Sequence, residues 1–308
     1  MEIKGSLDSG VRGIVGKFGN RIKRGGSASF RFCDLHNDVI TEISSEKFSG
    51  YVRRMKKVGV ETILISVWTT NMENPVRELV RCKGLINNIM EYGGQCPRLL
   101  LHIEDAWFID KINIDEIIAL KPYSIGITWN DKNKLAGGAN SEGKLTSFGK
   151  KIIERFVKSN VVVDVAHLNR KSFYEVVDIV KKHGGKLFCT HTCFDEVNPH
   201  PRNLDGKQIQ TIIDMGGLIG LTLVGDFLNP CGNATMHDVY NHIKYSVQNF
   251  GEDNLAIGTD FFGTENLPKG LKKYKDFKRL KKFLIKKGFC QVVIMKIFYV
   301  NAKKFFDI

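Results

Sequence analysis

The sequence predicts an α/β fold, a closed (β/α)8 barrel of the metal-dependent hydrolase type. Short apolar runs alternate with helix-patterned stretches eight times over about 250 residues, as in such barrels. Five of these runs end in residues that bind metal or move protons. Buried polar side chains are costly without partners, so their recurrence at strand ends indicates that they converge on one site.

Runs rich in β-branched and aliphatic residues predict strands at 30–36, 61–68, 98–104, 123–129, 161–167, 186–191, 217–224 and 254–260. Helical periodicity predicts helices near 48–58, 74–92, 112–120, 147–159, 170–183, 206–215, 236–249 and 272–287. Strands that alternate with helices pair in parallel. A doubly wound open sheet is the alternative, but no Gly-rich phosphate turn follows an early strand.

The chain divides into residues 1–29 and a single catalytic barrel over residues 30–308. Residues 1–29 are basic and rich in Gly and Ser, which predicts a poorly ordered extension or a packed lead-in. In 272–287 apolar residues recur every three positions among Lys and Arg. We interpret this segment as an outer helix of the barrel with a solvated lysine face; the alternative is a basic helix for anionic membranes.

The formal charge of +13 comes from the ends of the chain. Residues 1–29 hold six Lys and Arg against two acids, residues 268–308 hold thirteen against two, and the middle is close to neutral. Aromatic stacking motifs, a zinc finger and an RNP sequence are missing from the basic segments, so no specific nucleic-acid partner is expected.

Seven cysteines are scattered without CxxC pairs, which favours reduced thiols in a cytoplasmic protein. Cys189 and Cys193 flank His191, but no second Cys/His pair stands at zinc-finger spacing, and we interpret both as small apolar side chains. The sequence has no apolar run long enough for a membrane span and no signal-peptide core.

His36 and Asp38 are one residue apart, so both point to one face if the first strand continues that far. Glu104 ends the third run, and the two oxygens of a carboxylate can each bind a different cation. The alternative for Glu104 is a loop carboxylate or a helix-capping acid, a role that suits Asp105 equally. His102 is interpreted as a packed core histidine.

His167 and His191 close two neighbouring runs, and imidazoles from adjacent parallel strands can meet at one zinc ion. Asp164 lies three residues before His167 and is expected to face outward, without chemistry. Asp260 closes the last run, where an acid can hold a water molecule and pass its proton to a leaving amine; a helix N-cap is the alternative.

Five motifs occur in the order and at roughly the spacing of the membrane (renal) dipeptidase family of the amidohydrolase superfamily, which the chain resembles. They are DLHND, HIED, VDVAHLNRKSF, CTHTC followed by HPRNL, and IGTDFFG. The resemblance covers about residues 30–306 and implies a binuclear zinc dipeptidase, a hydrolase of the metallopeptidase kind. Its substrates are dipeptides, including ones with a D-residue at the C-terminal position.

The resemblance also implies the roles of individual residues. One zinc ion is bound by His36 and Asp38, the other by His167 and His191, and Glu104 bridges the two. A hydroxide shared by the metals attacks the scissile carbonyl, and Asp260 handles its proton. A further residue, Arg202, receives the free carboxylate of the substrate.

The chain departs from the family pattern at two positions. Trp129 stands where many relatives have a histidine that contacts the substrate carbonyl, so carbonyl polarisation rests on metal alone. Phe262 stands where an acid is common, which indicates a less polar pocket.

Two alternatives stay open: a metal hydrolase of another small amide, ester or lactone, and a noncatalytic barrel that binds an anionic partner. A homodimer also stays open.

Overall fold

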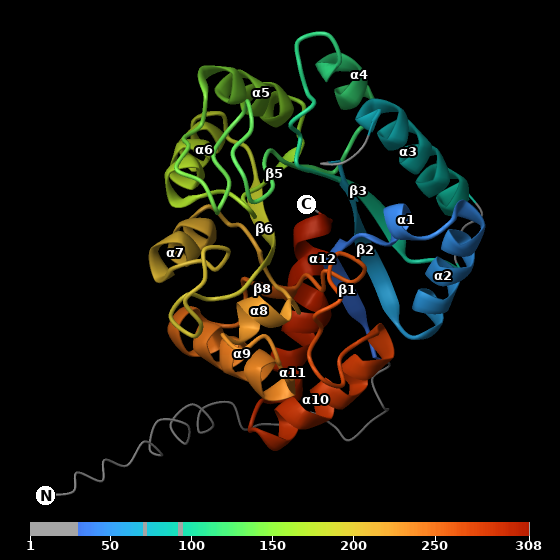
Figure 1. Ribbon diagram of the computed structural model, residues 1–308. Coiled ribbons are helices and arrows are strands. Elements are labelled where there is room, and N and C mark those ends of the chain that lie inside the picture. Colours follow the sequence, from blue (N-terminus) through green and yellow to red (C-terminus); the bar gives the residue numbers. More distant parts are fainter. Residues whose placement is uncertain (1–29, 70–72, 92–94, 308) are drawn as a thin grey trace, which may run out of the picture.

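The computed structural model describes residues 30–69, 73–91 and 95–307, so the predicted extension at 1–29 lies outside the described residues. The barrel prediction is confirmed (Figure 1). All eight strands pair in parallel, each with its neighbour in chain order. They are β1 Phe32–Asn37, β2 Val60–Trp68, β3 Arg98–Glu104, β4 Ser124–Gly126, β5 Val162–Asp164, β6 Leu187–Thr192, β7 Ile219–Leu221 and β8 Leu255–Ile257.

The first and last strands come together to close the barrel almost completely. A parallel bridge joins Asn37 to Phe261, just beyond β8. Asp34 in β1 accepts hydrogen bonds from both the backbone N–H (2.8 Å) and the hydroxyl (2.7 Å) of Thr259. A buried carboxylate therefore ties the end of β8 to β1.

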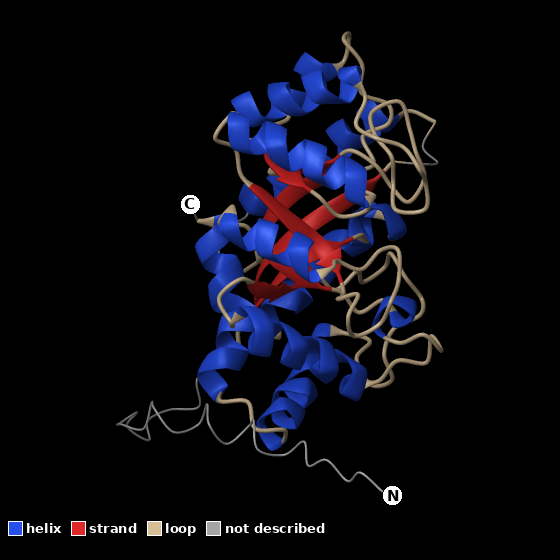
Figure 2. Ribbon diagram, turned by 90° about the vertical axis from the view of Figure 1, so that its left-hand side faces the viewer, coloured by secondary structure: helices blue, strands red, loops and turns tan. Residues whose placement is uncertain are grey.

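The predicted helices are present on the outside of the strands, and most of the long loops gather on one side (Figure 2). They are α2 Ser45–Lys57, α3 Pro75–Glu91, α4 Ile114–Ala119, α5 Ser147–Lys158, α6 Arg170–Lys182, α7 Gly206–Asp214, α9 Met236–Phe250 and α10 Phe277–Lys286. Two short helices, α1 Val39–Glu42 and α8 Gly225–Leu228, follow β1 and β7, and a 3-10 turn, η1 Tyr274–Asp276, precedes α10.

Helix α10 has the arrangement expected of an outer barrel helix. Phe277, Leu280 and Leu284 are buried, and most of the lysines between them are exposed. Within the described residues, the helices are too short or too polar to cross a membrane.

The chain ends in three helical segments that the sequence patterns did not predict: α11 Gln291–Met295, the π-helical η2 Lys296–Val300 and α12 Asn301–Phe306. Phe305 and Phe306 pack with the inward-facing strand residues Leu35, Leu64 and Phe188. The Asn301 amide donates to the carbonyl oxygen of Leu255 at 2.8 Å. The last helix thus closes the amino-terminal end of the barrel, opposite the ends that carry the polar residues.

Candidate metal centre

The predicted ligands lie together at the carboxyl ends of the strands, where such barrels place their active sites. Each is almost completely buried: His36, Asp38, Glu104, His167 and His191. His36, Glu104 and His191 belong to strands, whereas Asp38 and His167 lie just beyond β1 and β5. Four chain segments that are far apart in the sequence therefore meet at one point.

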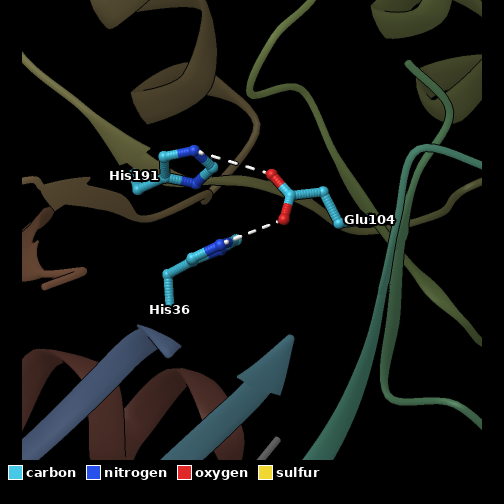
Figure 3. A group of neighbouring side chains, drawn as sticks. All are labelled: His36, Glu104 and His191. Carbon is cyan, nitrogen blue, oxygen red and sulfur yellow. Dashed lines mark ion pairs between the residues drawn. The ribbon is translucent and has the colours of Figure 1, made fainter. Parts of the chain in front are cut away.

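Glu104 is the centre of this group (Figure 3). Its Oε2 lies 3.3 Å from Nε2 of His36, and its Oε1 lies 2.9 Å from Nε2 of His167 and 3.8 Å from Nε2 of His191. The Ser66 hydroxyl donates to Oε2 at 2.9 Å. Each oxygen of one carboxylate thus faces a different set of imidazoles.

Two more carboxylates, those of Asp38 and Asp260, lie beside the ring of His36. Its Nε2 lies 3.5 Å from Oδ2 of Asp38 and 3.8 Å from Oδ1 of Asp260. Asp38 reaches this position in a way that the sequence did not predict. The strand ends at Asn37, and Asp38 is the N-cap of α1, so a helix start rather than strand alternation brings the two side chains together.

These residues fit a metal ion. Nε2 of His36 and Oδ2 of Asp38 are buried without a hydrogen-bond partner, which is costly for polar atoms. The Nε2 atoms of His167 and His191 lie only 2.8 Å apart. Imidazole nitrogens and carboxylate oxygens at these separations form the donor set that zinc and related divalent ions prefer.

The buried charges shift one another's pKa values. Burial lowers the pKa of His36, but the Glu104 and Asp38 carboxylates outweigh it and raise this pKa well above its usual range. Burial, together with the nearby Arg202 guanidinium, lowers the pKa of His167 to about 4. Burial and the Asp38 carboxylate raise the pKa of Asp260. A bound cation would act against this last shift because it favours the ionised carboxylate.

Two of the site residues have backbone conformations that L-residues seldom adopt. The φ angles of His167 and Asp260 are +65° and +59°, in the left-handed region. Such conformations cost about 1–3 kcal/mol each and persist where the surroundings hold them. Both residues follow the end of a strand, and this turn of the backbone directs their side chains into the site.

The expectation for Asp164 was wrong. Asp164 is buried and points into the barrel, where its Oδ2 accepts from the Thr190 hydroxyl at 2.6 Å and lies 3.3 Å from Nε2 of His102. The chain leaves the strand after Asp164, so counting alternate residues back from His167 fails. His102 is fully buried, as predicted for a core histidine.

Arg202 lies beside the candidate metal centre. Its Nη2 donates to Nε2 of His191 at 2.9 Å and to the His191 carbonyl oxygen at 3.2 Å, while its Nε is buried without a partner. A pocket of about 350 Å³ opens next to it, lined among others by His167, Arg170 and Gln208. The guanidinium therefore lies between the histidines and a cavity.

Trp129 is half-buried at the edge of the site. Its ring lies 6.1 Å from the ring of His167 and 5.3 Å from that of Trp68. Phe262 is 40% exposed and contacts the ring of Tyr51 edge-on.

The sequence analysis did not identify Asn130 and Thr190 as residues that contact the candidate ligands His167 and His191. The Asn130 side chain lies 2.9 Å from Nδ1 of His167. Each of the two residues stands next to a residue that the motifs singled out, but polarity alone did not distinguish them from loop residues.

The cysteines are all free. Cys189 and Cys193 are buried in the apolar core, as small apolar side chains are.

The fold and this group of side chains define a metal-dependent hydrolase built on a TIM barrel. Residues 99–307 match the model of the membrane dipeptidase family, peptidase family M19, and the chain belongs to that family. It is a hydrolase of the dipeptidase class. The matched part contains Glu104, His167, His191 and Asp260, and the fold adds His36 and Asp38 from β1 and its end.

Three similar proteins illustrate the relationship. An uncharacterised Klebsiella pneumoniae protein from the pqqA 5′ region is 30% identical over 217 residues, which cover 66% of this chain and 79% of that protein. An uncharacterised dipeptidase of Schizosaccharomyces pombe is 25% identical over 170 residues, 50% of this chain and 40% of its own length. A Rhodobacter sphaeroides metallopeptidase structure, solved with a phosphinate mimic of L-Ala-D-Ala, superposes with a TM-score of 0.75 at 16% identity, covering 91% of this chain and 99% of that one.

Proposed function

We propose that this protein hydrolyses the peptide bond of dipeptides with two zinc ions per chain. His36 and Asp38 would hold one ion, His167 and His191 the other, and Glu104 would bridge them. When bound, such a pair of cations supplies a hydroxide near neutral pH and stabilises negative charge on the carbonyl oxygen.

The observation that carries this proposal is the placement of Glu104. Its Oε2 faces His36 at 3.3 Å and its Oε1 faces His167 at 2.9 Å. A carboxylate that served one cation, or only a buried salt bridge, would not need imidazoles on both oxygens. The two orphaned atoms beside it, Nε2 of His36 and Oδ2 of Asp38, support a cation on the Oε2 side.

Asp260 is the proposed proton carrier. Its carboxylate lies within 3.8 Å of His36, and its side chain is 13% exposed, so it faces both the candidate ligands and the opening of the site. A carboxylate in this position can take a proton from the attacking water and deliver it to the leaving amine.

Arg202 is proposed to receive the free carboxylate of the dipeptide. A guanidinium binds a carboxylate through two parallel hydrogen bonds, and the adjoining pocket has room for a small substrate. In this structure Nη2 donates to Nε2 of His191, the atom that a metal ion would use. Zinc at that nitrogen would leave the guanidinium free for the substrate.

The stereochemistry of the substrate rests on similarity alone. The Rhodobacter sphaeroides structure holds a mimic of L-Ala-D-Ala, so we include dipeptides with a D-residue at the C-terminal position. Trp129 would form an apolar wall beside His167 for the substrate.

The test combines metal analysis with a substrate panel. Purified protein should contain about two zinc ions per chain and hydrolyse L,L and L,D dipeptides, but neither a tripeptide nor simple lactones. Glu104→Gln should lose both zinc and turnover. Glu78→Gln is the matched control, because Glu78 pairs with Arg81 on the surface of α3. Zinc-loaded protein without dipeptide turnover would disprove the proposal, and lactone hydrolysis alone would favour another hydrolase reaction.

A further inference from the structure

We propose that Thr190, held by Asp164, is a positioning residue that sets the ring proton of two histidines at once. Its hydroxyl would keep a proton on Nδ1 of both His36 and His191, so that both Nε2 atoms present lone pairs to the metal centre. The inference rests on the proposed function, since it concerns the same candidate ligands.

The Thr190 hydroxyl lies among three polar partners. Its oxygen is 2.6 Å from Oδ2 of Asp164, 2.8 Å from Nδ1 of His191 and 3.2 Å from Nδ1 of His36. All four residues are buried, so water cannot replace a partner that is missing. The oxygen must therefore satisfy all three neighbours with one hydrogen atom and two lone pairs.

The number of donors decides where the protons lie. An ionised carboxylate only accepts, so the single hydrogen of Thr190 is committed to Asp164. The two lone pairs of the oxygen can then only accept. Nδ1 of His36 and Nδ1 of His191 must both donate to them, so a ring that binds zinc as neutral imidazole does so through Nε2.

Asp164 is held in the orientation that this arrangement needs. Its Oδ1 accepts from the backbone N–H groups of Thr190 and Ala166, each at 3.0 Å, which leaves Oδ2 for the hydroxyl. The backbone of Thr190 is also confined. A Cβ atom on Gly220 or Gly258 would lie 1.9 Å from the Thr190 carbonyl oxygen, so only glycine allows the strands to approach so closely.

The two rings serve different parts of the centre. Nε2 of His36 faces Asp38 and Oε2 of Glu104, and Nε2 of His191 lies nearest to Nε2 of His167. One hydroxyl would therefore prepare a ligand for each proposed zinc ion. His167 has a separate partner, since its Nδ1 lies 2.9 Å from the Asn130 side-chain oxygen. A substitution of Thr190 should therefore leave the position of the ring proton of His167 unchanged.

The chain contains a matched control for this pair. Asp34 and Thr259 form the same hydroxyl–carboxylate contact, at 2.7 Å, between β1 and the end of β8. Thr259 also immediately precedes a proposed site residue, Asp260. The Thr259 hydroxyl contacts Asp34 and the His36 carbonyl oxygen and accepts from the Phe261 backbone N–H at 3.2 Å, and none of its hydrogen-bond partners among the described residues is an imidazole nitrogen. Thr259→Val therefore removes a similar buried hydroxyl without touching a ring nitrogen.

The experiment measures ring protons and zinc affinity, neither of which needs a substrate. Protein labelled with ¹⁵N-histidine and loaded with zinc would be studied by ¹H–¹⁵N correlation spectra, and its zinc affinity by competition with a chromophoric chelator. His36 and His191 should carry protons on Nδ1 and bind zinc through Nε2. Thr190→Val should lower zinc affinity about 10–100-fold, the usual effect of losing a partner of a metal ligand. Thr190→Ser should restore it.

Asp164→Asn gives a sharper outcome. Because Oδ1 holds two backbone donors, the amide nitrogen should take the place of Oδ2 and donate to Thr190. The hydroxyl hydrogen is then free for one imidazole, whose ring proton moves to Nε2. One of the two Nδ1–H signals should therefore disappear in the zinc-free protein.

The inference is overturned if Thr190→Val keeps both Nδ1–H signals and its zinc affinity. It is equally overturned if Thr259→Val weakens zinc binding as much as Thr190→Val does, since the effect would then be a general loss of packing. Failure of dipeptide turnover would defeat the proposed function but leave these measurements unaffected.

Discussion

Oδ1 of Asp260 lies 3.8 Å from Nε2 of His36, the same nitrogen that faces Oδ2 of Asp38 at 3.5 Å. Two carboxylates thus approach one buried imidazole nitrogen, and Asp260 does so from a left-handed backbone conformation. Like charges repel at such separations unless a cation or a proton lies between them. The arrangement suits an acid that alternates between holding and releasing a proton beside a metal ion.

Asp260→Asn should therefore retain zinc but lose most turnover. An amide has nearly the same shape but cannot carry the proton, and general acid–base groups contribute about 10²–10⁴-fold to rate. The measurement is kcat on a dipeptide, with zinc content determined on the same sample. Asp276→Asn, a change at another buried aspartate, is the control and should keep kcat. Unchanged turnover in Asp260→Asn would remove its proton-transfer role.

Arg202→Ala should mainly raise the KM for dipeptides. A hydrogen bond to a charged group is worth about 1.5–3 kcal/mol, which corresponds to roughly a 10–150-fold higher KM if the carboxylate loses its partner. Arg170→Ala is the matched control, because Arg170 lines the same pocket but is largely exposed and pairs with Asp205 at 3.0 Å. An unaltered KM in Arg202→Ala would mean that the carboxylate is bound elsewhere.

Trp129 should contribute to substrate binding through the apolar surface of its ring. Its recorded contacts are with the rings of Trp68 and His167, so Trp129→Phe should keep most of the activity. Trp129→Ala removes the apolar wall and should raise KM by roughly 2–13-fold, since aromatic contacts are worth about 0.5–1.5 kcal/mol. Steady-state kinetics of the two variants separate the contribution of the aromatic ring surface from that of the indole N–H. A loss in Trp129→Phe as large as in Trp129→Ala would indicate that the indole N–H matters.

His242 should make the fold sensitive to acid. It is fully buried in α9, where its Nδ1 accepts from the Phe194 N–H at 3.2 Å, and burial lowers its pKa to about 4. The unfolded chain binds this proton near pH 6.5, so stability is lost as pH falls from about 6.5 to 4. The loss is about 3–4 kcal/mol, at 1.4 kcal/mol for each pH unit.

Urea unfolding of the metal-free protein at pH 7 and pH 4.5 would check this expectation. His242→Gln should show a smaller pH dependence than the unchanged protein. His237→Gln, at an exposed position of the same helix, should leave the pH dependence as it is. Parallel pH profiles for His242→Gln and the unchanged protein would contradict the assignment.

The sequence predicted the barrel well because strand and helix periods are local properties. All eight predicted strands and eight predicted helices occur, although β4, β5, β7 and β8 are only three residues long. The closing segments η2 and α12 were not predicted, because their apolar residues face the inside of the barrel and the neighbouring strand ends rather than one outer face. Nothing in a single segment shows which strands it will cover.

The candidate site was predicted unevenly for a related reason. His36, Glu104 and His191 lie on strands, and strand ends in a parallel barrel meet at one edge, so their convergence followed from their positions. Asp164 was assigned to the wrong face, because the alternation of a strand stops where the strand stops. Asn130 and Thr190 became visible only when distant segments were placed side by side.

The sequence by itself determined the barrel, the order of the ligand-type residues and the family to which the chain belongs, since these follow from composition, spacing and motif. The tertiary structure decided which oxygen of Glu104 faces which histidine, and that one threonine hydroxyl touches two rings from different strands. Those relationships depend on separations of about 3 Å between residues as far apart as His36 and Thr190. Only the closed barrel brings such residues within hydrogen-bond distance.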